Sequence, residues 1–184
     1  MKKLWEIIKY ICTDFVEEYE IEAKPVMQPV EIKSEVIPPT SRERLYQTAY
    51  DCLLPRRDVS PLDRAPDDVA CVESVWEVYK LCFGVYPSGS KSKVEVSTVR
   101  ALIVLTSSNL FRQVSKPTPG CIILNVTGQG NGRVSNGHIG ICGKTHIMSN
   151  TSRNSYWEAN YTYREWNDYF NIKGGMRTYY FEPK

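Results

Sequence analysis

The strongest constraint on the fold is a hairpin pattern near the middle of the second half of the chain. Two short runs rich in isoleucine and small residues, 138–142 and 146–150, flank Gly143 and predict two antiparallel strands joined by a tight turn. Gly143 is expected to supply a positive φ at that turn. Side chains alternate along a strand, so His138 faces away from the isoleucines. Because the isoleucine face is the natural core, His138 is expected to face a cleft or a second layer.

A nucleophile and a base can be assigned around this hairpin. Cys71 follows Asp67 and Asp68 at a predicted helix start, where the helix dipole and unpaired backbone N–H groups favour a thiolate. His138 heads the first strand, and Asn150 ends the second, where it would orient the imidazole. A Cys, a His and a polar orienting residue in this arrangement are typical of a thiol hydrolase. The alternative is structural, since a Cys near a helix start is commonly a small buried apolar residue.

Helix caps, glycine stops and proline breaks predict three helices before the sheet, at about 41–53, 68–83 and 97–105. Thr40 or Ser41 is the expected N-cap of the first helix, and Gly84 the expected end of the second. Further strands are expected at 121–126 and 177–181. The aromatic residues near the C-terminus are interpreted as core. This order of elements predicts an α+β domain with N-terminal helices packed on a small antiparallel β-sheet.

The chain divides into three predicted parts. Residues 1–19 form an amphipathic helix, and residues 20–41 carry four prolines among charged residues, which is typical of an extended linker. Residues 42–184 form the main domain. The helix would pack on the domain, associate with itself or bind weakly to a membrane surface. We expect neither a signal peptide nor a transmembrane span, because charged residues interrupt every apolar run.

Composition disfavours several function classes. The net charge of the 184 residues is only +2, so the concentrated basic patch of a nucleic-acid-binding protein is not expected. The six cysteines form no CxxC pair, and the chain has two histidines, which disfavours both a structural zinc site and a metal-dependent amidase. We therefore expect no metal and no cofactor. The cysteines are expected to be mostly reduced thiols, one of them reactive.

These motifs resemble one group of enzymes. The Gly-His-Ile-Gly-Ile run at 137–141, preceded by Pro-Gly-Cys at 119–121, is similar to the second half of the NlpC/P60 and CHAP peptidoglycan hydrolases. Cys121 stands where those proteins usually have Asp, and residues 69–72 differ from their common Asp-Cys-Ser-Gly. Asn150 stands where NlpC/P60 proteins often have His and CHAP proteins often have Glu, Asp or Asn. These departures leave the subfamily open.

The resemblance extends over roughly residues 42–182 and implies a papain-like fold. It implies that Cys71 is the nucleophile, His138 the base and Asn150 the orienting residue of a cofactor-free hydrolase acting on bacterial peptidoglycan. The bond would be a stem-peptide bond or the amide between muramic acid and L-alanine. Many bacteriophage endolysins look like this, which implies synthesis in the host cytoplasm and release to the periplasm or cell wall for lysis. The alternative is a catalytically inactive wall-binding or virion module of the same fold.

A glycine-rich stretch, 127–135, connects two predicted strands and has no P-loop motif. One interpretation is a mobile hairpin loop. The other is the rim of a substrate cleft, with Asn131, Arg133 and Asn136 as polar contacts to the substrate.

Overall fold

The structure is a computed structural model, and it describes residues 38–54, 59, 70–92, 95–132, 134, 136–151 and 156–184. These residues belong to one compact unit, Pro38–Lys184. The predicted N-terminal helix at 1–19, and all but the last residues of the predicted linker at 20–41, lie outside the described residues. The unit combines helices with an antiparallel sheet, which confirms the predicted α+β class.

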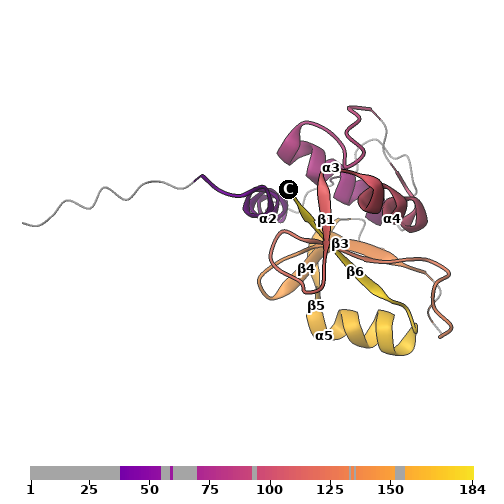
Figure 1. Cartoon of the computed structure of the whole chain (residues 1–184). Coiled ribbons are helices and arrows are strands. Elements are labelled where there is room, and N and C mark those ends of the chain that lie inside the picture. Colours follow the sequence, from indigo (N-terminus) through magenta and orange to yellow (C-terminus); the bar gives the residue numbers. More distant parts are fainter. Residues whose placement is uncertain are drawn as a thin grey trace, which may run out of the picture. The chain divides into compact units, whose positions relative to one another are not determined.

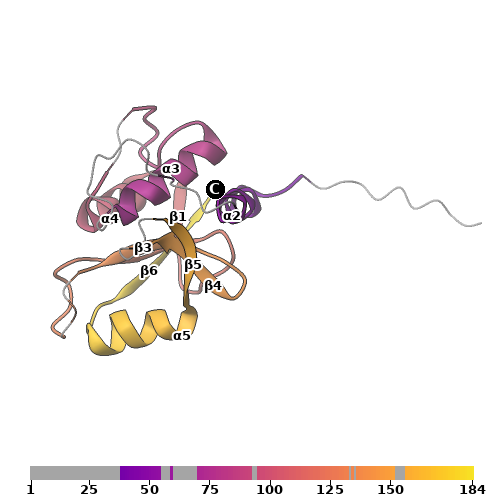
Figure 2. The same cartoon turned by 180° about the vertical axis from the view of Figure 1, so that it is seen from behind.

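In the described part of the chain, six strands form one antiparallel sheet in the order β1-β6-β2-β3-β4-β5. Helices α3 and α4 lie on one side of this sheet, and α5 lies on the other (Figures 1 and 2). The strands are β1 (Phe111–Val114), β2 (Ile122–Asn125), β3 (His138–Cys142), β4 (His146–Asn150), β5 (Trp157–Thr162) and β6 (Thr178–Pro183).

The first described helix, α2 (Ser41–Asp51), begins where its sequence signal predicts. The Thr40 side chain accepts a hydrogen bond from the Glu43 backbone N–H at 3.2 Å, and the Glu43 carboxylate accepts the Thr40 N–H at 2.8 Å. This reciprocal capping box satisfies two donors that a helix start otherwise leaves unpaired. Helix α4 (Thr98–Ser107) also begins as predicted, with Ser97 at its N-cap position.

Helix α3 (Cys71–Phe83) differs from the prediction at its start and agrees at its end. Its N-cap is Ala70, which makes no side-chain capping bond, so the predicted start near 68 and the predicted aspartate cap are wrong. The aspartates themselves lie outside the described residues. Gly84 ends the helix in the left-handed conformation at φ 76°, as expected, because glycine adopts that conformation without a steric penalty.

Two apolar clusters occupy the two faces of the sheet. On the helical face, Ile139 and Ile141 of β3 pack into a large core with α2, α3 and α4. On the opposite face, Cys142 of the same strand belongs to a smaller cluster with Trp166 and Phe170. This alternation confirms the predicted assignment of the β3 side chains and places a second layer, rather than solvent, on the face to which His138 belongs.

The β3–β4 turn is present, but its predicted glycine conformation is wrong. Gly143 is not among the glycines with positive φ. Its N–H donates to the His146 carbonyl oxygen at 2.8 Å, and a Cβ built on Gly143 would lie only 2.5 Å from that oxygen. Glycine is required at this position because the two strands approach closely and not because of its φ.

Three parts of the fold were not predicted from the sequence: the edge strands β1 and β5, and the helical segment that begins with α5. Strand β1 pairs with β6 at the edge of the sheet. Helix α5 (Tyr163–Trp166) continues as the π-helix η2 (Asn167–Lys173) and lies below the sheet in Figure 1. The aromatic residues there divide by face, since Trp166 and Phe170 are buried, as predicted, whereas Tyr169 is 44% exposed.

Candidate active site

His138 opens β3, and its imidazole packs against the aromatic layer formed by β5, α5 and η2. Its ring centroid lies 5.6 Å from that of Trp166, 5.8 Å from that of Tyr161 and 5.9 Å from that of Phe170, with the Phe170 ring stacked nearly parallel. Burial disfavours the charged imidazolium and lowers the pKa of His138 to about 4. The imidazole is therefore neutral near pH 7.

A chain of two hydrogen bonds fixes the His138 ring. Its Nε2 lies 2.9 Å from the Ser149 hydroxyl, and that hydroxyl donates to the Asn160 side-chain oxygen at 2.8 Å. A hydroxyl has a single hydrogen to donate, so the Ser149 oxygen must accept from the imidazole. The neutral ring consequently carries its proton on Nε2. Its Nδ1 has the free lone pair, and no described residue forms a hydrogen bond to it.

The position of Asn160 depends on an irregularity in β5. Ile147 of β4 pairs with Tyr161 and Met148 pairs with Ala159, so Asn160 is an extra residue between two consecutive pairs. Such a β-bulge turns the side chain of the extra residue away from simple alternation. Asn160 thereby reaches Ser149 on the neighbouring strand.

Cys71 is the first residue of α3 and so lies in the first turn of the helix, as expected, and it is half-buried. Burial raises the pKa of the thiol to about 11, although hydrogen bonds from the backbone N–H groups of Ile139, Val72 and Cys71 itself act to lower it. The prediction that the helix start favours a thiolate is therefore wrong for the resting protein, because the cost of desolvation exceeds the contribution of these donors.

The surroundings of the Cys71 thiol overlap only in part with those of the imidazole. The backbone N–H that approaches Cys71 belongs to Ile139, which directly follows His138. Burial raises the pKa of Tyr161, and the charges of Tyr169, Glu165 and Cys71 add to that rise. Cys71 itself packs against the core on the helical face of the sheet, whereas Tyr161, which contacts the His138 ring, packs against the cluster on the other face. No hydrogen bond joins the Cys71 thiol to the imidazole in the described part of the chain.

The other predicted site residues are Asn150, Asn131, Arg133 and Asn136. Asn150 is buried at the end of β4, opposite Trp157, and the contact to the imidazole predicted for it is made instead by its neighbour Ser149. Asn131 and Asn136 are exposed, and Arg133 lies outside the described residues.

The glycine-rich loop between β2 and β3 packs against the segment that follows η2. The Gly132 N–H donates to the Gly174 carbonyl at 3.0 Å, and Gly175, at φ 64°, lies directly against the Asn131 side-chain oxygen. These contacts fix the described part of the loop to the end of the helix that covers His138.

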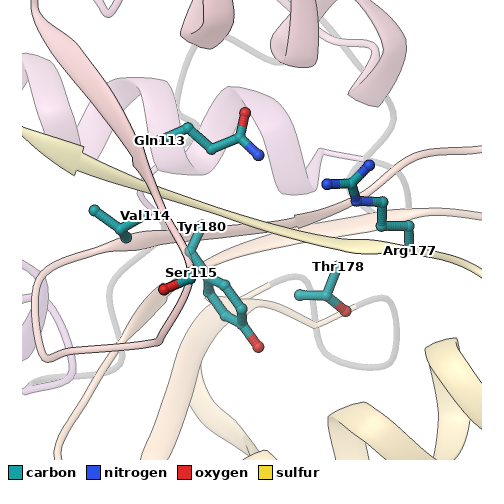
Figure 3. A pocket seen from close by; sticks show the side chains of 6 residues that line it. All are labelled: Gln113, Val114, Ser115, Arg177, Thr178 and Tyr180. Carbon is teal, nitrogen blue, oxygen red and sulfur yellow. The ribbon is translucent and has the colours of Figure 1, made fainter.

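A shallow depression of about 430 Å³ lies along β1 and β6 and not beside His138. The pairing of β1 with β6 ends at Val114 and Tyr180, so the earlier residues of β6 have no β1 partner and a hollow opens there. Figure 3 shows the Gln113 and Arg177 side chains on one side of β6, and the Tyr180 ring on the other. None of the predicted catalytic residues lines it, and its open shape gives no indication of a bound substrate. Its lining residues are Gln113, Val114, Ser115, Arg177, Thr178 and Tyr180.

Within the described ranges, no group of three or more His, Cys, Asp or Glu side chains is arranged to hold a metal ion. The described helices include none that is both long and apolar enough to cross a membrane. Comparisons with models of protein families, with curated proteins and with solved structures found no match to this chain.

Proposed function

We propose that this protein is a cysteine-dependent peptidoglycan hydrolase with a papain-like fold of the NlpC/P60 or CHAP type. In this proposal Cys71 is the nucleophile and His138 the general base. Ser149 and Asn160 together take the orienting role that the sequence suggests for Asn150. The substrate is an amide of the cell-wall peptide, and the biological role is lysis of a bacterial host by an endolysin-like enzyme.

The observation that carries this proposal is the protonation state of the His138 imidazole. The Ser149–Asn160 pair fixes the proton of His138 on Nε2 and leaves Nδ1 as a base. The thiol of Cys71 receives the N–H of the residue immediately after His138. A nucleophile at a helix start and a base held by a third group are the components that activated-nucleophile catalysis requires.

The two pKa values decide how such a reaction would begin. With the thiol pKa near 11 and the imidazole pKa near 4, the resting pair is neutral and not a thiolate–imidazolium pair. His138 Nδ1 would take the thiol proton as sulfur attacks the carbonyl carbon, and would give it to the leaving amine when the C–N bond breaks. Water would then cleave the thioester, with Nδ1 accepting its proton and returning it to sulfur.

The alternative function, an inactive wall-binding or virion module, is favoured by one specific feature of the site. Trp166 and Phe170 cover the imidazole on the side away from α3, and both titrating groups are neutral. A Cys and a His retained only for packing would have these properties. Wall binding without cleavage would then be the function of the same surface.

The two functions are separated by digesting purified Gram-negative and Gram-positive peptidoglycan and identifying the fragments by mass spectrometry. Wild type is expected to release fragments whose masses identify the bond, whereas Cys71→Ala and His138→Ala release none. Cys82→Ala is the matched control, because Cys82 lies near the other end of the same helix, and it should retain wild-type activity.

Fragments released equally by Cys71→Ala would refute the catalytic assignment. Sedimentation of wild type with an undigested wall, in the absence of any fragments, would establish the binding module instead. Circular dichroism of each variant shows whether a loss of activity reflects loss of the fold.

A further inference from the structure

Two cysteines outside the candidate site face each other across neighbouring strands. Ile122 of β2 pairs with Ile141 of β3, so Cys121 and Cys142 form the next position along the same ladder. The Cys142 N–H donates to the Cys121 carbonyl at 2.8 Å, which confirms that the two backbones remain joined there. Both residues are free thiols in the structure.

A turn before β2 directs the Cys121 side chain toward its partner. Gly120 has a φ of 89°, and its N–H donates to the Cys142 carbonyl at 2.8 Å, while the Cys121 N–H donates back to Thr118 at 3.0 Å. Gly120 and Cys121 therefore both oppose Cys142, which is a β-bulge with glycine in its first position. The bulge places Cys121 in the same apolar cluster as Cys142, on the face covered by α5.

The two thiols are both shielded from solvent and belong to the same apolar cluster. Each cysteine is 0% exposed. Burial raises the pKa of Cys142, and the neighbouring Cys121 raises it further. The Thr118 hydroxyl lies 3.0 Å from the Cys121 sulfur. Directly opposed residues of antiparallel strands have Cα atoms about 4.5–5.5 Å apart, within the range of about 4.4–6.8 Å found for disulfides.

We propose that Cys121 and Cys142 are a disulfide-forming pair that joins β2 to β3 when the chain folds in the presence of a disulfide oxidant. In the reaction with oxidised glutathione, the thiolate of one cysteine forms a mixed disulfide and releases one reduced glutathione. The second cysteine attacks that bond and releases another. Two protein thiols and one glutathione disulfide thus give one protein disulfide and two glutathione thiols. The pairing occurs before burial is complete, and the folded domain then shields the bond. This inference does not depend on the proposed hydrolase activity.

The test is to refold the full-length chain from urea in a buffer of reduced and oxidised glutathione, block remaining thiols by alkylation, and map disulfides by proteolysis and mass spectrometry. We expect one intramolecular bridge, between Cys121 and Cys142, to predominate. The Cys52→Ala and Cys82→Ala variants should still form this bridge. The Cys121→Ala variant should form no predominant bridge between other cysteines. A predominant disulfide between any other two cysteines would overturn the proposal. So would a fully reduced chain under conditions in which a reference protein forms its disulfides.

A second measurement uses wild type alone and so does not depend on the folding of any variant. Because both sulfurs are fully buried, dithiothreitol should reduce the bridge at least about tenfold more slowly in the native protein than in urea. Equal rates in the two conditions would show that the bridge does not lie in the buried position, and would overturn the assignment.

Discussion

Acid should destabilise this domain through one histidine. His138 is neutral in the folded protein, with a pKa lowered to about 4 from the ordinary value of 6.5, because burial disfavours its charged form. Between these two pKa values the unfolded chain binds a proton that the folded chain does not. The contribution of His138 to the free energy of unfolding is therefore complete above pH 6.5 and decreases as the pH falls toward 4.

The size of the effect follows from the two pKa values. Their difference, 6.5 minus about 4, is roughly 2.5, and each pKa unit corresponds to 1.36 kcal/mol, so the full contribution is about 3 kcal/mol. About 2 kcal/mol of it is expected to disappear between pH 7 and pH 5. Typical domains have a free energy of unfolding of about 5–15 kcal/mol, so the loss is large enough to measure by denaturant titration.

The assay is urea unfolding of wild type, His138→Gln and His146→Gln at pH 7, 6 and 5, followed by circular dichroism. Other groups also titrate in this range, so the informative quantity is the difference in pH slope between wild type and variant. His138→Gln removes the titrating group and should flatten the slope by about 2 kcal/mol between pH 7 and pH 5. His146, the other histidine, is exposed beside the hairpin turn, and His146→Gln is the control for replacing a histidine elsewhere in the same hairpin.

A wild-type slope in His138→Gln would refute this reasoning, because it would mean that the imidazole is solvated or already charged in the folded state. NMR titration provides an independent measurement, since the two imidazole signals can be assigned from the same two variants. A signal of His138 that titrates at or above 6.5 would contradict the neutral resting pair on which the proposed mechanism depends.

Three other predictions concern the glycine bulge, the imidazole and the thiol. Gly120→Ala should lower the free energy of unfolding, measured in urea, by at least roughly 2 kcal/mol, because the φ of Gly120 is positive and a Cβ there would overlap a main-chain carbonyl. Gly128 has a similar φ but open space around it, so Gly128→Ala should lower the same free energy by only about 1 kcal/mol. Asn160→Ala removes the acceptor of the Ser149 hydroxyl, so that this hydroxyl should donate to the His138 imidazole instead. A change in the ¹⁵N chemical shifts of the His138 ring would detect the new hydrogen bond. Alkylation of Cys71 by iodoacetamide should be slow at pH 7 and rise about tenfold per pH unit toward pH 11, and a plateau below pH 9 would contradict the raised pKa.

Local sequence signals were sufficient for much of the fold. The N-cap at Thr40, the glycine after Phe83 and the alternation along β3 each depend on interactions within a few residues, and each occurs as predicted. The short edge strand β1 lacks such a signal, because its pairing partner is β6, about 70 residues away. Helix α5 and η2 were interpreted only as aromatic core, although the buried Trp166 and Phe170 have the i, i+4 spacing of one helical face.

The pKa values show why the identity of a residue and its position on a helix do not determine its chemistry. Cys71 lies at the predicted helix start, and backbone N–H groups do approach its sulfur. A sequence gives the number of these donors but not the depth of burial, which depends on how β3 and the aromatic layer pack around the thiol. In this protein the desolvation of the thiol outweighs the backbone donors, so the pKa of Cys71 shifts in the direction opposite to the one expected.

The orienting residue for His138 illustrates the same limit in the backbone. Simple alternation along β4 and β5 gives no reason to join Ser149 to Asn160, and the sequence prediction chose Asn150 because it ends the second strand of the hairpin. One extra residue in β5 changes this, because the bulge turns Asn160 toward Ser149 and so determines which ring nitrogen of His138 carries the proton. A shift of one residue in strand register therefore decides whether Nδ1 or Nε2 can act as a base, and Asn160→Ala tests that dependence more directly than any change at Asn150.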